Sequence, residues 1–302
     1  MMPVSVSITL RHQGIAFSAL ALVFSALIVL LPAWNPGVDI ALMGILIFVL
    51  GVPHGAFDVI FAKRLYTLVS WRRWTVFCAA YSLMAAAVVG IWWLLPAAFL
   101  VAFLVVSAFH FSGDLENGTP ALVRLFYGAS VLVFPAWFHE GEVARLFGYL
   151  ASGPFAAQLA VLLHALSLPW SVALVLTLLL QPRQRWATSL EVVSVALLAT
   201  AAPPLVGFTV FFCLMHSARH TIRTHRYAAV LSWRDLLKKA SAPMVACLVA
   251  GAALWPRLSG LDFDAAVIQM LFVGLAALTV PHMVLIERIR LGGWQSDDQP
   301  SR

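Results

Sequence analysis

Long apolar stretches recur along this chain, and they limit the folds that it can adopt. Residues 14–32 contain no charged side chain, and comparable stretches follow one another as far as residue 286. Hydrophobic residues make up 62% of the chain and charged residues 11%, whereas a soluble domain has about 25% charged residues. A water-soluble globule of this length could not bury so much apolar surface. The sequence therefore predicts an all-α fold, a polytopic integral membrane helical bundle.

Prolines and polar segments divide the apolar stretches into separate spans. A spanning helix needs roughly 20 apolar residues. The candidate spans are residues 14–32, 38–61, 74–95, 97–112, 121–138, 157–180, 187–202, 203–222, 242–256 and 263–286. Three of them, 97–112, 187–202 and 242–256, are short for a span. We therefore expect about 8–10 transmembrane helices.

The basic residues predict how the bundle is oriented. Lys and Arg mark the cytoplasmic loops of membrane proteins. With the N-terminus inside and an even number of spans, all but Arg145 and Arg257 of the 19 Lys and Arg residues lie on the cytoplasmic side. Both termini are therefore expected in the cytoplasm, as short tails at 1–13 and 291–302 around a single transmembrane domain at 14–290. The net charge of +6 then reflects these loops, and no nucleic-acid partner is expected.

Five of the nine histidines share one predicted level of the membrane, on four different spans: His54, His110, His216, His220 and His282. A single histidine in a span is usually a hydrogen-bonded core residue. Five at one depth suggest a metal site, because neutral imidazole is the commonest metal ligand. His216 and His220 are four residues apart, which places both rings on one helix face.

Two aspartates follow two of these histidines at the same spacing. Asp58 comes four residues after His54, and Asp114 comes four residues after His110. A metal-bound histidine usually donates its second N–H to a carboxylate or a carbonyl. The aspartates are expected either to orient the ligand rings or to reach water at a helix end. Arg219 could pair with one of them or face lipid headgroups.

The ligand types favour iron as the metal. Four neutral imidazoles leave open coordination positions, which suits dioxygen binding at a ferrous centre. Catalytic zinc more commonly takes three protein ligands and a water. His282 could be a fifth ligand, a neighbour of the ligands or a residue that contacts substrate.

Four motifs together resemble a known family. They are GVPHGAFD with His54 and Asp58, FHFSGD with His110 and Asp114, HSARH with His216 and His220, and PHMVLIE with His282. Their combination and order are similar to the Brp/Blh family of integral-membrane β-carotene dioxygenases of bacteria and archaea, which often accompany rhodopsins. The resemblance runs from about residue 40 to residue 290, and Ser112 departs from the glycine expected in many relatives.

The resemblance implies an Fe2+-dependent oxygenase of the cell inner membrane. Such an enzyme cleaves the central 15,15' double bond of β-carotene with O2 and releases two molecules of retinal, which could pass through the lipid bilayer to an opsin. The family's ferrous ligands fall on His54, His110, His216 and His220. Asp58, Asp114 and His282 would then be catalytic residues, which orient the rings or carry protons, and residues 14–290 would form the catalytic domain.

Two other functions fit part of the pattern. A membrane di-iron desaturase or hydroxylase needs roughly eight histidines in clustered boxes, and this chain has five at the required level. A transporter for divalent metal ions or protons could line its path with His and Asp, although such a path should cross both halves of the membrane. The metal that copurifies with the protein distinguishes these alternatives.

Overall fold

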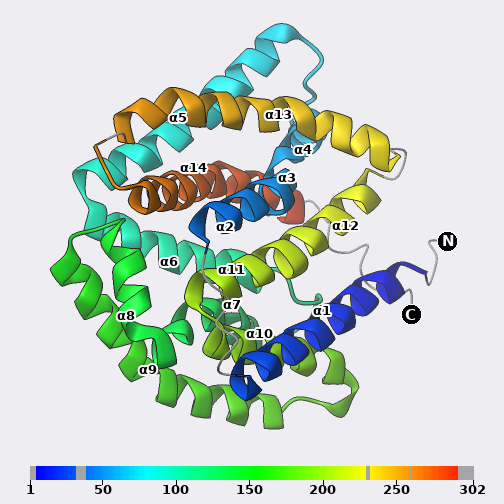
Figure 1. Ribbon diagram of the computed structural model, residues 1–302. Helices are drawn as coiled ribbons and strands as arrows, with labels where there is room; N and C mark the ends of the chain where they lie inside the picture. Colours follow the sequence, from blue (N-terminus) through cyan, green and yellow to red (C-terminus); the bar gives the residue numbers. More distant parts are fainter. Residues whose placement is uncertain (1–4, 32–38, 229–231, 259, 292–302) are drawn as a thin grey trace.

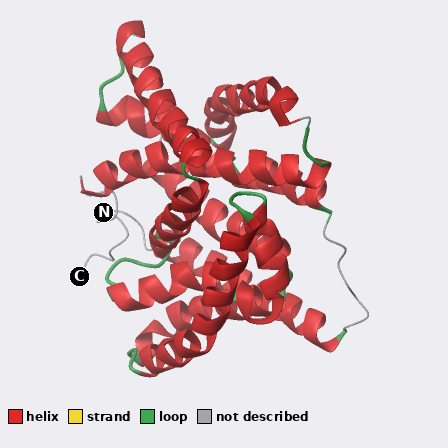
Figure 2. Cartoon of the chain, turned by 90° about the vertical axis from the view of Figure 1, so that its left-hand side faces the viewer, coloured by secondary structure: helices red, strands yellow, loops and turns green. Residues whose placement is uncertain are grey.

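The structure is a computed structural model that describes residues 5–31, 39–228, 232–258 and 260–291. Within these ranges all regular secondary structure is helical (Figures 1 and 2). The helices are α1 Ser5–Leu30, α2 Ile40–Leu46, α3 Pro53–Ala56, α4 Asp58–Leu65, α5 Trp71–Leu94, α6 Pro96–Ser112, α7 Ala121–Val133, α8 Pro135–Gly148, α9 Gly153–Leu179, α10 Trp186–Ala201, α11 Pro204–Phe211, α12 Ala218–Tyr227, α13 Trp233–Leu254 and α14 Phe263–Leu291. Short turns η1 Ile47–Gly51, η2 Arg183–Arg185, η3 Phe212–Ser217 and η4 Trp255–Leu258 connect or interrupt them.

The lengths of these helices confirm a polytopic membrane bundle. Seven helices in the described residues are long and apolar enough to cross a membrane, or eight if α7 and α8, bent by 48°, count as one span. Eight is the lower end of the predicted range. The predicted spans 97–112 and 187–202 correspond to α6 and α10, which have 17 and 16 residues and are shorter than the seven helices long enough to cross a membrane.

The N-terminal helix begins earlier than the apolar pattern predicts. Residues 1–13 were expected to form a tail, but α1 starts at Ser5. The polar end of this helix has partners inside the bundle, because the Gln13 amide donates to the Leu214 carbonyl at 2.9 Å and accepts from the Arg219 Nε at 2.9 Å. Those contacts allow the helix to continue beyond its apolar part. The predicted tail at 291–302 lies almost wholly outside the described residues.

Apolar side chains cover the outside of the bundle as they would in contact with lipid. None of the residues of α5 is buried, and Leu83, Trp93 and Leu94 are all more than 70% exposed. A soluble protein would not leave such a helix uncovered. The segment α2–α4, α14, α6 and α11–α12 lie in the middle of the molecule, between α5 and α13 on one side and α1, α7–α10 on the other (Figure 1).

Two π-helical turns interrupt the central helices. η1 follows α2, η3 follows α11, and the two turns contact each other. The Ser217 hydroxyl donates to the carbonyls of Leu50 and Gly51 at 2.8 and 2.9 Å, which satisfies oxygens at the end of η1. Gly51 is required there, because a Cβ at this position would collide with the Phe212 ring. Such turns are frequent at functional sites, and both lie beside histidines.

Candidate metal centre

Three of the predicted ligand histidines form a compact group. His54 lies on α3, His110 near the end of α6 and His216 in η3, and their ligating nitrogens are all within 4.8 Å of one another. The ring centroid of His216 lies 4.5 Å from the ring centroid of His110 and 5.0 Å from that of His54. This is the only group of this kind found among the described residues. Its three donors could hold one metal ion.

The other two histidines of the predicted level lie beside this group. The His220 ring, on α12, is 5.4 Å from His54 and 5.1 Å from His282. The His282 ring, on α14, is 5.3 Å from both His54 and His110. The structure thus brings all five histidines together, with three in the tighter group and two at its edge.

Each of the two aspartates contacts a histidine from a different part of the chain. The Asp114 carboxylate lies 2.9 Å from the His216 Nδ1, and the Asp58 carboxylate lies 2.7 Å from the His282 Nδ1. In the sequence each aspartate follows a different histidine by four residues, His54 for Asp58 and His110 for Asp114. A continuous helix through each motif would bring those neighbours together. The structure separates α3 from α4 at Phe57, and Asp114 lies beyond the end of α6.

These contacts fix which nitrogen of each ring is available to a metal. An ionised carboxylate can only accept a hydrogen bond, so Nδ1 of His216 and of His282 carries the hydrogen. The Nε2 of each ring then has a free lone pair, and both Nε2 atoms are buried without a hydrogen-bond partner. An unsatisfied buried polar atom costs about 1–3 kcal/mol. A cation bound to the group would satisfy it, so the residues present fit a metal ion.

His54 is oriented by the backbone and not by a carboxylate. Its Nδ1 lies 2.6 Å from the Gly51 carbonyl at the end of η1. A carbonyl also only accepts, so Nδ1–H donates and Nε2 is left for another partner. The glycine-rich sequence around His54 therefore includes the last residue of the π-helical turn η1, Gly51, whose carbonyl is this acceptor.

Two tyrosines that were not singled out in the sequence complete the carboxylate contacts. The Tyr81 hydroxyl donates to Asp58 at 2.9 Å, and the Tyr127 hydroxyl donates to Asp114 at 3.3 Å. Each metal-site aspartate therefore lies between a tyrosine and a histidine. The signal in the sequence was weak: a buried tyrosine hydroxyl needs a partner, but its identity depends on helix packing.

Arg219 has a partner that neither sequence alternative included. It is buried and forms an ion pair with Glu191 on α10, through both terminal nitrogens at 2.8 and 2.7 Å. It also donates to the backbone carbonyl of Asp114 at 3.0 Å. Glu191 is the one carboxylate in the predicted span 187–202, and such a residue usually has a specific partner.

An apolar cavity of about 480 Å3 opens beside the histidines. His54, Asp58 and His282 form its polar wall. Its other walls are mainly apolar and come from α5, α13 and α14: Phe77, Cys78, Tyr81, Ser82, Ala242, Pro243, Ala246, Cys247, Ala250, Leu275, Leu278 and Thr279. The size and the lining are typical of a site for an apolar organic ligand.

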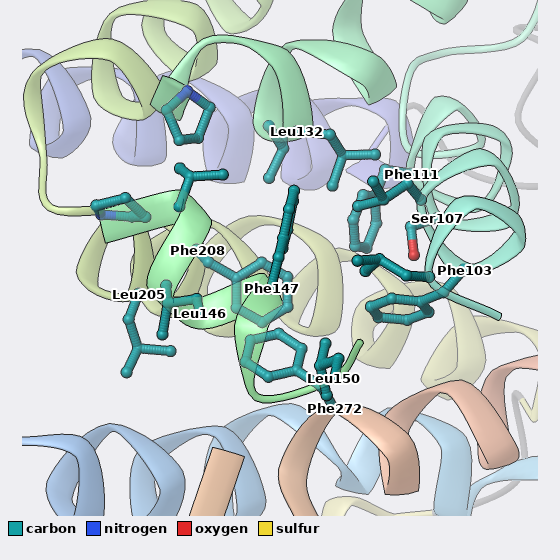
Figure 3. A pocket seen from close by; sticks show the side chains of 16 residues that line it. Phe103, Ser107, Phe111, Leu132, Leu146, Phe147, Leu150, Leu205, Phe208 and Phe272 are labelled. Carbon is teal, nitrogen blue, oxygen red and sulfur yellow. The ribbon is translucent and has the colours of Figure 1, made fainter. Parts of the chain in front are cut away.

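A second, smaller cavity lies among α6, α7, α8, α11 and α14. It has a volume of about 80 Å3, and Figure 3 shows the rings of Phe103, Phe147, Phe208 and Phe272 around it. Phe208 stacks on Phe212 at 5.3 Å, and Phe212 lines the larger cavity. An aromatic wall therefore separates the two spaces.

The comparisons with known proteins agree with this site. Residues 45–290, which include all five histidines, match the profile of a family described as beta-carotene 15,15'-dioxygenase. The chain belongs to this family. It is similar to the beta-carotene 15,15'-dioxygenase of an uncultured marine bacterium, 66A03, with 31% identity over 264 residues that cover 83% of this chain and 94% of the relative. No solved structure matches the chain.

Family membership settles the class of protein. The chain is a multi-pass membrane oxygenase of the carotenoid dioxygenase type, which is the class that the four motifs indicated. This family is distinct from the transporters and the di-iron desaturases, the two alternative classes that the histidine pattern alone had left open.

Proposed function

We propose that this protein uses O2 to cleave the central 15,15' double bond of β-carotene and forms two molecules of all-trans-retinal. The observation that carries this proposal is a group of three histidines, one of which, His54, lines an apolar cavity, in a chain of the beta-carotene 15,15'-dioxygenase family. β-Carotene is a hydrocarbon without hydrogen-bonding groups, and the mainly apolar lining of the cavity matches it.

The proposed cofactor is Fe2+, held by His54, His110, His216 and His220. The donors are neutral imidazoles, and the Nε2 atoms of His216 and His282 are buried without a hydrogen-bond partner. When bound, ferrous iron supplies the one-electron chemistry through which dioxygen reacts with an alkene.

The residues around the histidines hold them ready for the metal. Asp114 accepts the Nδ1–H of His216, and Asp58 accepts the Nδ1–H of His282, so each ring keeps one tautomer and one orientation. Asp58, Asp114 and His282 are proposed as catalytic residues on this basis. Tyr81 and Tyr127 hold the aspartates in turn.

The cavity positions the substrate. Its apolar walls on α5, α13 and α14 bind the polyene and exclude water, and His54 and His282 lie in the wall where the double bond must be. Cleavage breaks one carbon–carbon double bond and leaves an aldehyde on each carbon. Both substrate and product are apolar, and the bilayer is the phase from which they enter and to which they leave.

The cellular arrangement is proposed on the same grounds. Residues 14–290 would form one transmembrane catalytic domain in the cell inner membrane, with both termini of the chain on the cytoplasmic side. The basic residues, concentrated on one predicted side, support this orientation. Retinal released into the bilayer could be handed to an opsin.

The test is to express the chain in bacteria that accumulate β-carotene and to separate the extracted pigments by chromatography. The wild-type chain should lower β-carotene and raise retinal, and His220→Ala should abolish both changes. His164→Ala is the control, because this histidine contacts Glu140 and the Ala136 carbonyl away from the metal group. Intact β-carotene in cells that contain inserted, iron-loaded wild-type protein would refute the assigned substrate.

A further inference from the structure

His282 has the same environment as His216, a member of the compact three-histidine group. Both side chains are buried, with 2% of each residue exposed. Each Nδ1 contacts an aspartate, at 2.7 Å for His282 and 2.9 Å for His216. Each Nε2 is buried without a hydrogen-bond partner. His282 therefore shares with His216 its burial, its aspartate partner and a buried Nε2 without a hydrogen-bond partner.

The position of the His282 ring fits coordination to the same ion. Two imidazoles bound to one ion at about 2.1 Å have ring centroids about 4.6 Å apart at right angles and about 5.3 Å apart at a tetrahedral angle. The His282 ring lies 5.3 Å from His54, 5.3 Å from His110 and 5.1 Å from His220. These separations are close to the tetrahedral value, and a six-coordinate ion would require the rings to move closer together.

The rings of His282 and His220 both lie against the compact group. The His282 ring lies 5.3 Å from His54 and 5.3 Å from His110, and the His220 ring lies 5.4 Å from His54. Both rings lie outside the set of nitrogens within 4.8 Å of one another. Each would need a small movement toward a bound ion.

A substrate contact alone does not account for His282. The ring lines the larger cavity, but a hydrocarbon cannot donate a hydrogen to the Nε2 lone pair. Burial of this nitrogen against a polyene would leave it unsatisfied, at a cost of about 1–3 kcal/mol. A metal ion satisfies it directly.

We infer that His282 is a fifth imidazole ligand of the metal, oriented by Asp58. This inference rests on the proposed function for the identity of the ion as Fe2+. Five imidazoles on a six-coordinate ion leave one open position, enough for dioxygen. The polyene would then react from outside the coordination sphere, and the cavity wall would have to position it.

Purified protein tests the inference through its iron. The variants are His282→Ala, His282→Gln, whose amide can still donate to Asp58, and Val284→Ala, a control at an exposed position of the same helix. Iron per chain is measured after dialysis against graded chelator, and the ferrous nitrosyl adduct is recorded by electron paramagnetic resonance. Loss of an outer partner of a ligand lowers metal affinity about 10- to 100-fold, and loss of a ligand should cost at least about 100-fold.

A ligand role requires four results. His282→Ala and His282→Gln both lose iron affinity to that extent, and both change the nitrosyl spectrum. Added imidazole moves the spectrum of His282→Ala back toward that of the wild type. Val284→Ala keeps the wild-type iron affinity and spectrum. The inference is overturned if His282→Gln keeps the wild-type affinity and spectrum, which would make His282 a positioning residue. If wild-type protein binds iron but forms no retinal, the proposed substrate fails while the ligand assignment stands.

Discussion

Arg219 and Glu191 form a buried bidentate ion pair that joins α12 to α10, at 2.8 and 2.7 Å. The same guanidinium donates to the Gln13 side chain and to the Asp114 carbonyl. It therefore ties the N-terminal helix, α10 and the aspartate beside His216 to the helix that carries His220. A buried pair of this kind costs desolvation energy, and its main contribution is to fix geometry.

Removal of one partner of this pair should destabilise the protein strongly. Glu191→Leu leaves Arg219 charged, buried and unpaired, and a loss of about 3–5 kcal/mol in unfolding free energy is expected. The double variant Glu191→Leu with Arg219→Met removes both charges and should recover most of that loss. Thermal unfolding in detergent, followed by circular dichroism, measures the two. A single variant as stable as wild type would show that the pair contributes little.

The carboxylate beside His216 should control metal affinity more than stability. Asp114→Asn keeps the size of the side chain but weakens its hold on the Nδ1–H of His216. A fall of about 10- to 100-fold in iron affinity is expected. Tyr127→Phe removes only the 3.3 Å contact to the same aspartate and should have a smaller effect. Chelator competition measures both, and equal losses in the two variants would contradict a special role for the carboxylate.

Close packing of the two π-helical turns makes Gly51 irreplaceable. A methyl group there meets the Phe212 ring, whereas one at Gly55 has no atom within 4 Å. Gly51→Ala should therefore cost about 1–3 kcal/mol of stability and displace His54, whose Nδ1 contacts the Gly51 carbonyl. Gly55→Ala should change stability little. Unfolding midpoints and iron content of the pair provide the check, and comparable behaviour would show that η1 adapts to the methyl group.

The sequence predicted which histidines form this site better than it predicted the partners of the charged residues around them. Histidines on separate spans could be placed at one depth because apolar stretches have a fixed length and alternate in direction. The partner of each aspartate could not be predicted, because the break at Phe57 and the π-helical turns depend on packing. Likewise, Glu191 is the one carboxylate in the predicted span 187–202 and was not singled out, because its pairing with Arg219 depends on α10 and α12 lying together.

Obstruction of the larger cavity should separate substrate binding from metal binding. Ala246 lines that cavity on α13, and its neighbour Val245 is 56% exposed on the outside of the same helix. Ala246→Trp should exclude or displace the polyene, and a displacement of about 1 Å can lower a rate about 100-fold. Retinal formation should fall by that order while iron content stays at the wild-type level, since no ligand is touched. Val245→Trp, which adds the same ring on the outer face, should leave both unchanged. If Ala246→Trp forms retinal as fast as wild type, the substrate does not occupy this cavity, and the smaller aromatic cavity around Phe208 becomes the alternative site.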